Sequence, residues 1–204
     1  ATHFREIKKS DFKTLDERRQ NHIDLIQKYQ KQQKVGKVVD FSVKSGTQSS
    51  NFFRIGTGSL GGKARGLAFA NLSLTATNLD KLYPNISIRI PNISVVGTDE
   101  FDRFMSVNEL WDVALKTNNN EKILKAFLKG ELSEELVHSL KVYLKEIKYP
   151  LAVRSSSLME DSQYQPLAGM YSTFMLPNSS GKLKERLSQV CEAIKRIFAS
   201  TFFQ

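Results

Sequence analysis

The chain has 204 residues, of which 40% are hydrophobic and 25% are charged, a balance typical of a globular protein with a sizeable core. No apolar run is long enough to span a membrane, the polar N-terminus does not resemble a signal peptide, and Cys191 is the only cysteine. These features exclude an intramolecular disulfide and lead us to expect a cytoplasmic protein.

The net charge of +9 is concentrated near the N-terminus. Residues 1–54 contain 12 Lys and Arg against 6 Asp and Glu, whereas the rest of the chain contains 18 against 15. Basic extensions of this kind are more often solvated helices or docking segments than readers of nucleic acid. The sequence has neither zinc-finger spacing nor an aromatic RNA-binding motif, and its three scattered histidines do not form a metal-ligand cluster: His3, His22 and His138.

The N-terminal quarter predicts a helix followed by a linker. Ser10 is a good cap for a helix over residues 10–34, whose apolar residues recur at helical spacing in a thin stripe. Residues 42–51 are rich in Gly and Ser, as in a flexible loop. We therefore predict a basic helical extension and linker over residues 1–50 and a main domain over residues 51–204.

The main domain mixes strand and helix signals, which favours an α+β fold. β-branched and aromatic runs predict strands, and apolar residues at helical spacing behind Ser, Thr or Gly predict helices. The expected strands are 52–55, 86–90, 93–96, 151–154 and 171–176; the expected helices begin at Ala64, Thr98, about Asn120, Ser133 and about Gly181.

A glycine-rich loop, Gly56-Thr57-Gly58-Ser59-Leu60-Gly61-Gly62-Lys63, lies between an expected strand and an expected helix. Backbone N–H groups and the helix dipole favour an anion at such a place, and Lys63 adds a positive charge. The spacing is not that of a Walker A loop. The alternative is an ordinary glycine turn with a lysine that faces solvent.

A second candidate follows the strand 151–153, where Arg154 precedes Ser155, Ser156 and Ser157. Arginine keeps its charge and presents a planar fork that suits phosphate oxygens. Loops at strand ends often form ligand sites. The alternative is a structural arginine that pairs with Glu160 or Asp161, and the two interpretations are compatible.

The third candidate is the run from Ala168 to Phe174. Gly169 would allow the backbone to approach a ligand closely, and Thr173 could donate a hydroxyl group. The alternative is a strand that begins at a glycine and has no ligand.

The order of these motifs resembles that in the N-terminal nucleotide-binding domain of phosphoenolpyruvate synthase and pyruvate phosphate dikinase. In this chain the motifs are Gly-Gly-Lys-Ala, Thr-Asp-Glu-Phe, Val-Arg-Ser-Ser, Glu-Asp, and Ala-Gly followed by Thr-Phe. The resemblance runs from about Arg54 to the last helix and is most specific over residues 151–174. It implies an α+β mixed sheet with packed helices, the first part of an ATP-grasp unit. It also implies that Lys63 and Arg154 contact ATP phosphates and that Gly169 and Thr173 line the phosphate region.

Members of this family pass a phosphoryl group from ATP to a histidine on a separate domain and then to pyruvate. The chain departs from the family's usual pattern at Gly-Gly-Lys-Ala-Arg-Gly and at Met170, where a glutamine is usual. The resemblance implies that the magnesium ligands, the phosphohistidine domain and the pyruvate-binding domain lie outside this chain. We therefore expect a fragment that holds the first half of the ATP-binding unit and that, alone, does not catalyse phosphoryl transfer and binds ATP weakly if at all.

Three other interpretations stay open at this point. A related dikinase could use another acceptor, such as water with a glucan, or a drug hydroxyl. A non-catalytic module for nucleotide sensing or docking could use the helix 10–34 to reach a partner. A nucleic-acid binder, the least favoured, would bind through the basic residues of the N-terminal segment in a salt-sensitive way.

Overall fold

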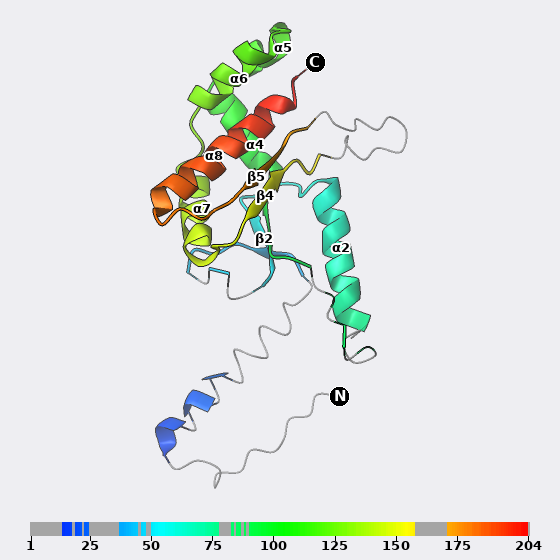
Figure 1. The fold of residues 1–204 in the computed structure, drawn as a ribbon, viewed down its shortest axis with the longest axis vertical. Coiled ribbons are helices and arrows are strands. Elements are labelled where there is room, and N and C mark those ends of the chain that lie inside the picture. Colours follow the sequence, from blue (N-terminus) through cyan, green and yellow to red (C-terminus); the bar gives the residue numbers. More distant parts are fainter. Residues whose placement is uncertain are drawn as a thin grey trace.

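The computed structural model of the chain describes residues 14–17, 19–21, 23–24, 37–44, 46–47, 50–77, 83, 85–86, 88, 90–157 and 171–203. Helices pack around a parallel three-stranded sheet and a two-stranded antiparallel sheet, which confirms the predicted α+β class (Figure 1). In chain order the elements are β1 (Val39–Asp40), β2 (Phe52–Ile55), α2 (Gly62–Thr77), β3 (Ile93–Val96), α4 (Thr98–Val107), α5 (Trp111–Lys116), α6 (Asn120–Lys129), α7 (Glu134–Glu146), β4 (Leu151–Arg154), β5 (Thr173–Leu176) and α8 (Leu183–Ser200).

The strands form a parallel sheet in the order β1-β2-β3 and a separate antiparallel pair, β4-β5. β2 is the central strand of the parallel sheet, and its Phe52, Phe53 and Ile55 are buried, as expected for a strand covered on both faces. β1 lies inside the range 1–50, and its Val39 is the register partner of Phe53. The division of the chain into two domains stays a prediction.

The largest apolar cluster joins α7 and α8 to the strands. α7 contributes Leu136, Leu140 and Leu144, and α8 contributes Val190 and Ile194. The inward side chains of β4 and β5 pack on the same cluster, because alternate strand residues point to one face. α8 therefore serves as the support on which the β4-β5 pair rests.

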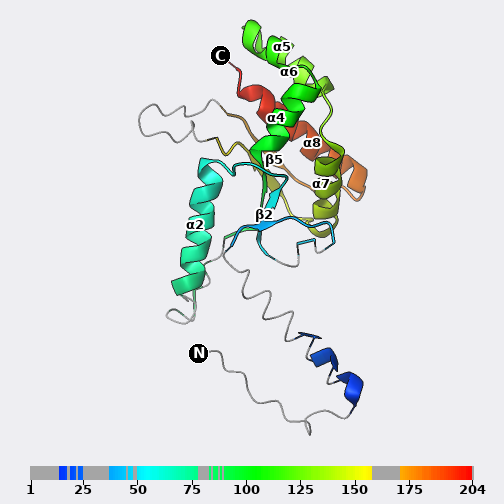
Figure 2. The ribbon, with the colours of Figure 1, turned by 180° about the vertical axis from the view of Figure 1, so that it is seen from behind.

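A second apolar cluster lies at the end of the molecule formed by α4, α5 and α6, where α8 also ends (Figure 2). Phe104, Ile123 and Phe127 are buried there. The ring centroids of Phe101 and Phe198 lie 5.0 Å apart with an edge-to-face geometry, an arrangement that aromatic pairs favour. This cluster fixes α4, whose first residues reach the glycine loop described below.

The helix α2 lies apart from the other helices in both views (Figures 1 and 2). It packs through a third and smaller cluster that includes Phe52, Ala64 and Val95. Phe69, which lies beyond this contact, is 74% exposed. The contact between α2 and the sheet is therefore confined to a narrow face of the helix.

Most expected elements are confirmed, including the helix that begins at Ser133, whose side chain accepts a hydrogen bond from Leu136 N. The helix expected from about Asn120 is capped by the preceding Asn119, which accepts a hydrogen bond from Lys122 N. The predicted strand over 86–90 is wrong where the structure describes it: Ile86 and Ile88 are exposed, outside any strand and without the partner strand that would bury them. The strand expected over 171–176 begins at Thr173. The short helix α5 was not predicted.

The helix predicted over 10–34 lies mostly outside the described residues, although those described between Leu15 and Asp24 are helical. Among the residues that the structure describes, no helix has the length and apolar character needed to cross a membrane.

Candidate functional site

The glycine loop between β2 and α2 is a tight structure that needs its glycines. Gly56, Gly58 and Gly61 have φ values of 76°, 88° and 79°, in the left-handed region that favours glycine. A Cβ atom on Gly58 would lie 2.2 Å from Oδ1 of Asp99. The loop therefore passes closer to its neighbours than any residue with a side chain would allow.

The start of α4 holds the first half of this loop. Thr57 Oγ1 donates a hydrogen bond to Asp99 Oδ2 at 2.6 Å, and Thr98 Oγ1 accepts one from Ser59 N at 2.9 Å. The backbone N–H of Thr98 in turn donates to the carbonyl oxygen of Ser59. These bonds fix the loop against a helix whose other end is anchored in the second apolar cluster.

The end of β4 holds the second half of the loop. Ser156 O accepts a hydrogen bond from Gly62 N at 2.8 Å, and Ser156 Oγ accepts one from Ala64 N at 3.0 Å. The same hydroxyl donates to Leu60 O at 2.8 Å. The Gly-Gly-Lys and Val-Arg-Ser-Ser motifs, which are separated by some 90 residues, are therefore in direct contact, and Figure 1 shows the start of α2 beside the end of β4.

Three backbone N–H groups at the start of α2 and just before it, those of Gly61, Gly62 and Ala64, are already bonded to protein atoms. Gly62 N and Ala64 N bond to Ser156, and Gly61 N donates to Ser59 Oγ at 3.3 Å. The sequence predicts that the N–H groups of this loop favour an anion, but the structure shows that protein acceptors already occupy these three donors. Attraction for an anion at this point depends on side chains.

Those side chains are basic. Lys63 and Arg65 both lie in the first turn of α2, and that turn, which is described in full, contains no acidic residue. Two positive side chains at the N-terminus of a helix interact unfavourably with the positive end of the helix dipole. A bound anion would offset this unfavourable interaction. Arg65 is exposed and donates to Ser59 Oγ at 2.8 Å, whereas Lys63 is half-buried with its Nζ atom almost fully shielded from solvent.

Arg154 and Thr173 lie on the open face of the β4-β5 pair. They are register partners at the end of the pair nearest to Ser156, and both side chains are exposed. Ala152 and Met175, the next partners on the same face, are exposed too. Their neighbours Val153 and Phe174 point the other way, toward α8. One face of the pair is thus core, and the other presents a cation and a hydroxyl group.

The structure brings three of the four predicted site residues into one region. Lys63 follows Gly62, which bonds to Ser156, and Arg154 precedes Ser156 by two residues in the chain. Thr173 is the cross-strand partner of Arg154. Gly169 lies outside the described residues, as do Glu160 and Asp161, the alternative partners of Arg154.

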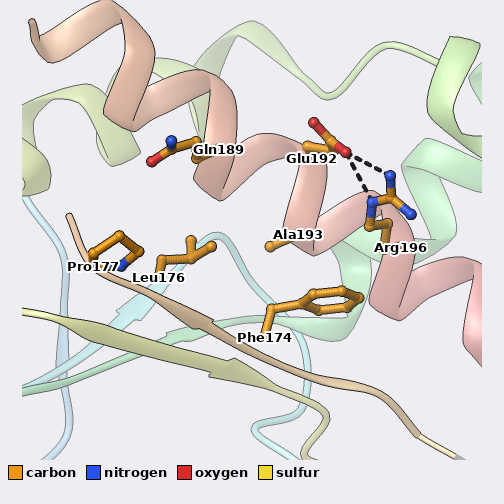
Figure 3. A pocket seen from close by; sticks show the side chains of 7 residues that line it. All are labelled: Phe174, Leu176, Pro177, Gln189, Glu192, Ala193 and Arg196. Carbon is orange, nitrogen blue, oxygen red and sulfur yellow. Dashed lines mark hydrogen bonds and ion pairs between the residues drawn. The ribbon is translucent and has the colours of Figure 1, made fainter. Parts of the chain in front are cut away.

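A shallow pocket of about 210 Å³ lies on the other side of β5, against α8 (Figure 3). Phe174 and Leu176 form its floor, and Arg196 Nε donates to Glu192 Oε1 at 2.8 Å across its rim. Because these residues alternate with Thr173 and Met175 along the strand, the pocket and Arg154 face opposite sides. It is therefore separate from the candidate site.

In the described ranges, no group of three or more His, Cys, Asp or Glu side chains gathers to hold a metal ion. Of the acidic residues at the glycine loop, Asp99 accepts a hydrogen bond from Thr57, and Glu100 lies against Gly56.

Sequence comparison decides the family. Residues 57–204, nearly three quarters of the chain, match the family model described as the pyruvate phosphate dikinase AMP/ATP-binding domain. The chain belongs to this family. The dikinase family domain is an ATP-binding part of kinases and phosphotransferases, and the match begins within the glycine loop and includes α2, β4 and β5. Comparisons with curated proteins and with solved structures gave no significant match.

Three residues of the candidate site were not among the predicted site residues. Ser156 was seen as part of a polar run, but its bonds to α2 depend on a contact between distant segments. Thr98 and Asp99 were interpreted as a helix start and as part of a motif in the family resemblance, and they also hold the loop. For Ser156, the signal was its place two residues after the arginine.

Proposed function

We propose that this chain binds ATP by its phosphate groups on the surface formed by the start of α2 and the end of the β4-β5 pair. Lys63 and Arg154 supply positive charge, Thr173 supplies a hydroxyl donor, and Gly169 allows close approach of the backbone. The observation that carries the proposal is the contact between Gly62 and Ser156, which joins the two basic motifs. Phosphoryl transfer depends mainly on such positioning and charge neutralisation.

The two cations would contribute differently. Arg154 is exposed on the open face and can form two parallel bonds to phosphate oxygens. Lys63 is enclosed in this conformation, and its flexible four-carbon stem would carry the ammonium group to a phosphate. The unfavourable pairing of Lys63 and Arg65 with the helix dipole supports an anion between them and the strand end.

In the complete reaction, we propose that a phosphoryl group of ATP passes to a histidine outside these residues and then to pyruvate, with magnesium ligands also supplied from outside. The isolated chain would then bind ATP without turning it over. A related acceptor, such as water with a glucan or a drug hydroxyl, would leave the ATP site unchanged. The proposal that the isolated chain does not turn ATP over would be contradicted if the purified chain released phosphate from Mg-ATP and Arg154→Ala abolished this release.

ATP titration of the 204-residue chain tests the binding site. Backbone amide signals in ¹H–¹⁵N spectra should shift near Lys63, Arg154 and Thr173. Arg154→Ala should weaken binding by roughly tenfold to 100-fold, because a hydrogen bond to a charged group contributes about 1.5–3 kcal/mol. Absence of any shift in these signals at millimolar ATP would overturn the proposal.

Arg103→Ala is a matched control. It removes the same charge from an exposed arginine on α4 that pairs with Glu135 at 2.9 Å. Binding of ATP should stay within about twofold, since a single distant surface charge contributes little. Equal losses in the two variants would indicate non-specific attraction to a basic surface rather than a site.

The variant Arg154→Ala also distinguishes an ATP-binding enzyme domain from a non-catalytic docking module. If the chain serves only to bind a protein partner, Arg154→Ala should leave partner binding intact and ATP should have no effect on it. An enzyme domain should lose its ATP half-reaction when Arg154→Ala is placed in the complete enzyme.

A further inference from the structure

Ser156 occupies the point where the two halves of the candidate site meet. Its carbonyl oxygen and its hydroxyl group take part in three hydrogen bonds to the loop and first turn that carry Lys63, with partners Gly62 N, Ala64 N and Leu60 O. Lys63 lies between two of these partners in the chain. Arg154 is held on the other side, two residues before Ser156, at the end of β4.

The contact between the start of α2 and the end of β4 is polar, because the two elements pack on different apolar clusters. The third cluster, which attaches α2 to the parallel sheet, includes Phe52, Ala64 and Val95 and, among the described residues, no member of β4 or β5. β4 and β5 pack instead on the first cluster with α7 and α8. The two cations therefore stand on elements that belong to different parts of the core.

The glycine loop and the end of β4 are also closely packed at this contact. Gly61 is buried, and a Cβ atom placed on it would lie 1.8 Å from the carbonyl oxygen of Ser156. The backbones of the loop and of the strand end are thus in direct contact. A displacement of Ser156 by a fraction of an ångström would be passed to the first turn of α2.

From this placement we propose that Ser156 is a positioning residue: it sets the distance between Lys63 and Arg154 so that both can bind one nucleoside triphosphate. This inference rests on the proposed ATP site and adds a role to a residue that would not touch the ligand. Both faces of its hydroxyl are used within the protein, as donor to Leu60 and as acceptor from Ala64. Phosphate contact stays with the cations.

A double-mutant cycle measured by ATP titration tests this role. Ser156→Ala should weaken ATP binding about tenfold in the otherwise unchanged chain. In a Lys63→Ala background, the same change should weaken binding by less than about twofold, because there is no longer a lysine to position. A residue that only stabilises the fold would give equal losses in the two backgrounds, and that result would overturn the proposal.

Ser155→Ala is the control within the same loop. Ser155 Oγ accepts a hydrogen bond from Ser157 N at 3.0 Å, so one loop bond is lost while the contact with α2 remains. ATP affinity should stay within about twofold. If Ser156→Ala does not fold, as judged by its amide spectrum, Ser156→Cys replaces it in the cycle, since a thiol is a weaker donor and acceptor.

The outcomes separate the two proposals. If Lys63→Ala and Arg154→Ala leave ATP binding unchanged, the proposed site is wrong and the positioning role falls with it. If both weaken binding while Ser156→Ala or Ser156→Cys does not, only the positioning role is overturned. Loss with Ser156→Ala that disappears in the Lys63→Ala background supports both.

Discussion

Arg154 and Thr173 face each other across the antiparallel β4-β5 pair, with both side chains on the exposed side. Directly opposed residues in such a pair have Cβ atoms roughly 4.5–5.5 Å apart, close enough to touch one phosphate group together. Because the opposite side of the pair packs on α8, neither side chain can turn into the core without breaking the strand alternation.

Thr173→Val should weaken ATP binding about threefold to tenfold, because one hydrogen bond to the ligand contributes about 0.5–1.5 kcal/mol. The free energy of unfolding should change by less than about 0.5 kcal/mol, since valine suits an exposed strand position. Thr173→Ser keeps the hydroxyl group and should bind ATP like the original chain. Equal affinities for the Val and Ser variants would remove Thr173 from the site.

Two glycine substitutions should change stability in opposite directions. Gly61→Ala places a Cβ atom against the carbonyl of Ser156 at a φ of 79°, and should lower the free energy of unfolding by about 2 kcal/mol or more. Gly66→Ala should raise it by about 0.5–1 kcal/mol, because Gly66 lies in the exposed part of α2 with no atom within 4 Å of its added Cβ. Urea unfolding measures both, and a Gly61→Ala chain as stable as the original would contradict the close contact.

Arg186→Met should lower the free energy of unfolding by about 3 kcal/mol. Arg186 is buried on α8 and donates to the carbonyl oxygens of Leu144 and Ile147 at the end of α7, and to Asn178 Oδ1. Its removal takes the arginine donor from both carbonyl groups; Ile147 O still accepts a hydrogen bond from Asn178 Nδ2, whereas Leu144 O loses its arginine partner. Arg196→Met, which breaks an ion pair at a half-exposed site, should cost less than about 1 kcal/mol. Similar urea midpoints for the two variants would show that Arg186 is not essential to the α7–α8 contact.

Stability should fall at alkaline pH because of Tyr143. Burial, and next the neighbouring Tyr149, raise the pKa of Tyr143 above its ordinary value of 10.0. The folded chain then keeps the proton at a pH where the unfolded chain releases it, so this stabilising contribution is complete below pH 10 and decreases above it. Tyr143→Phe should show a smaller loss of stability between pH 10 and 11.5 in urea unfolding. The same slope in both chains would exclude Tyr143 as the cause.

Local signals in the sequence were sufficient for the helices α6, α7 and α8 and for β4. Asn119 and Ser133 provide caps, and apolar residues at helical spacing follow each of them. The wrong strand over 86–90 has the same origin as the correct ones, because Ile86 and Ile88 are β-branched. Propensity says nothing about whether a partner strand is available, and in this case the isoleucines stay exposed.

Lys63, Arg154 and Thr173 could be selected from residue type and from their place at element ends. Their mutual position could not, because it depends on the bonds of Ser156 to Gly62 and Ala64 across the whole helical region. The occupied N–H groups at the start of α2 could not be foreseen for the same reason. A glycine loop before a helix looks alike in sequence whether its donors face a ligand or another strand.

The contact between Ser156 and the glycine loop has a consequence for the order of folding. Ala64 and Ser156 are 92 residues apart, whereas the contacts within α4 to α7 join neighbouring segments. Closing a loop of that length costs more chain entropy than forming helix pairs, so this contact should form late, after the helices that it spans. Partly folded chains would then contain most of their helices while the two basic motifs are still far apart.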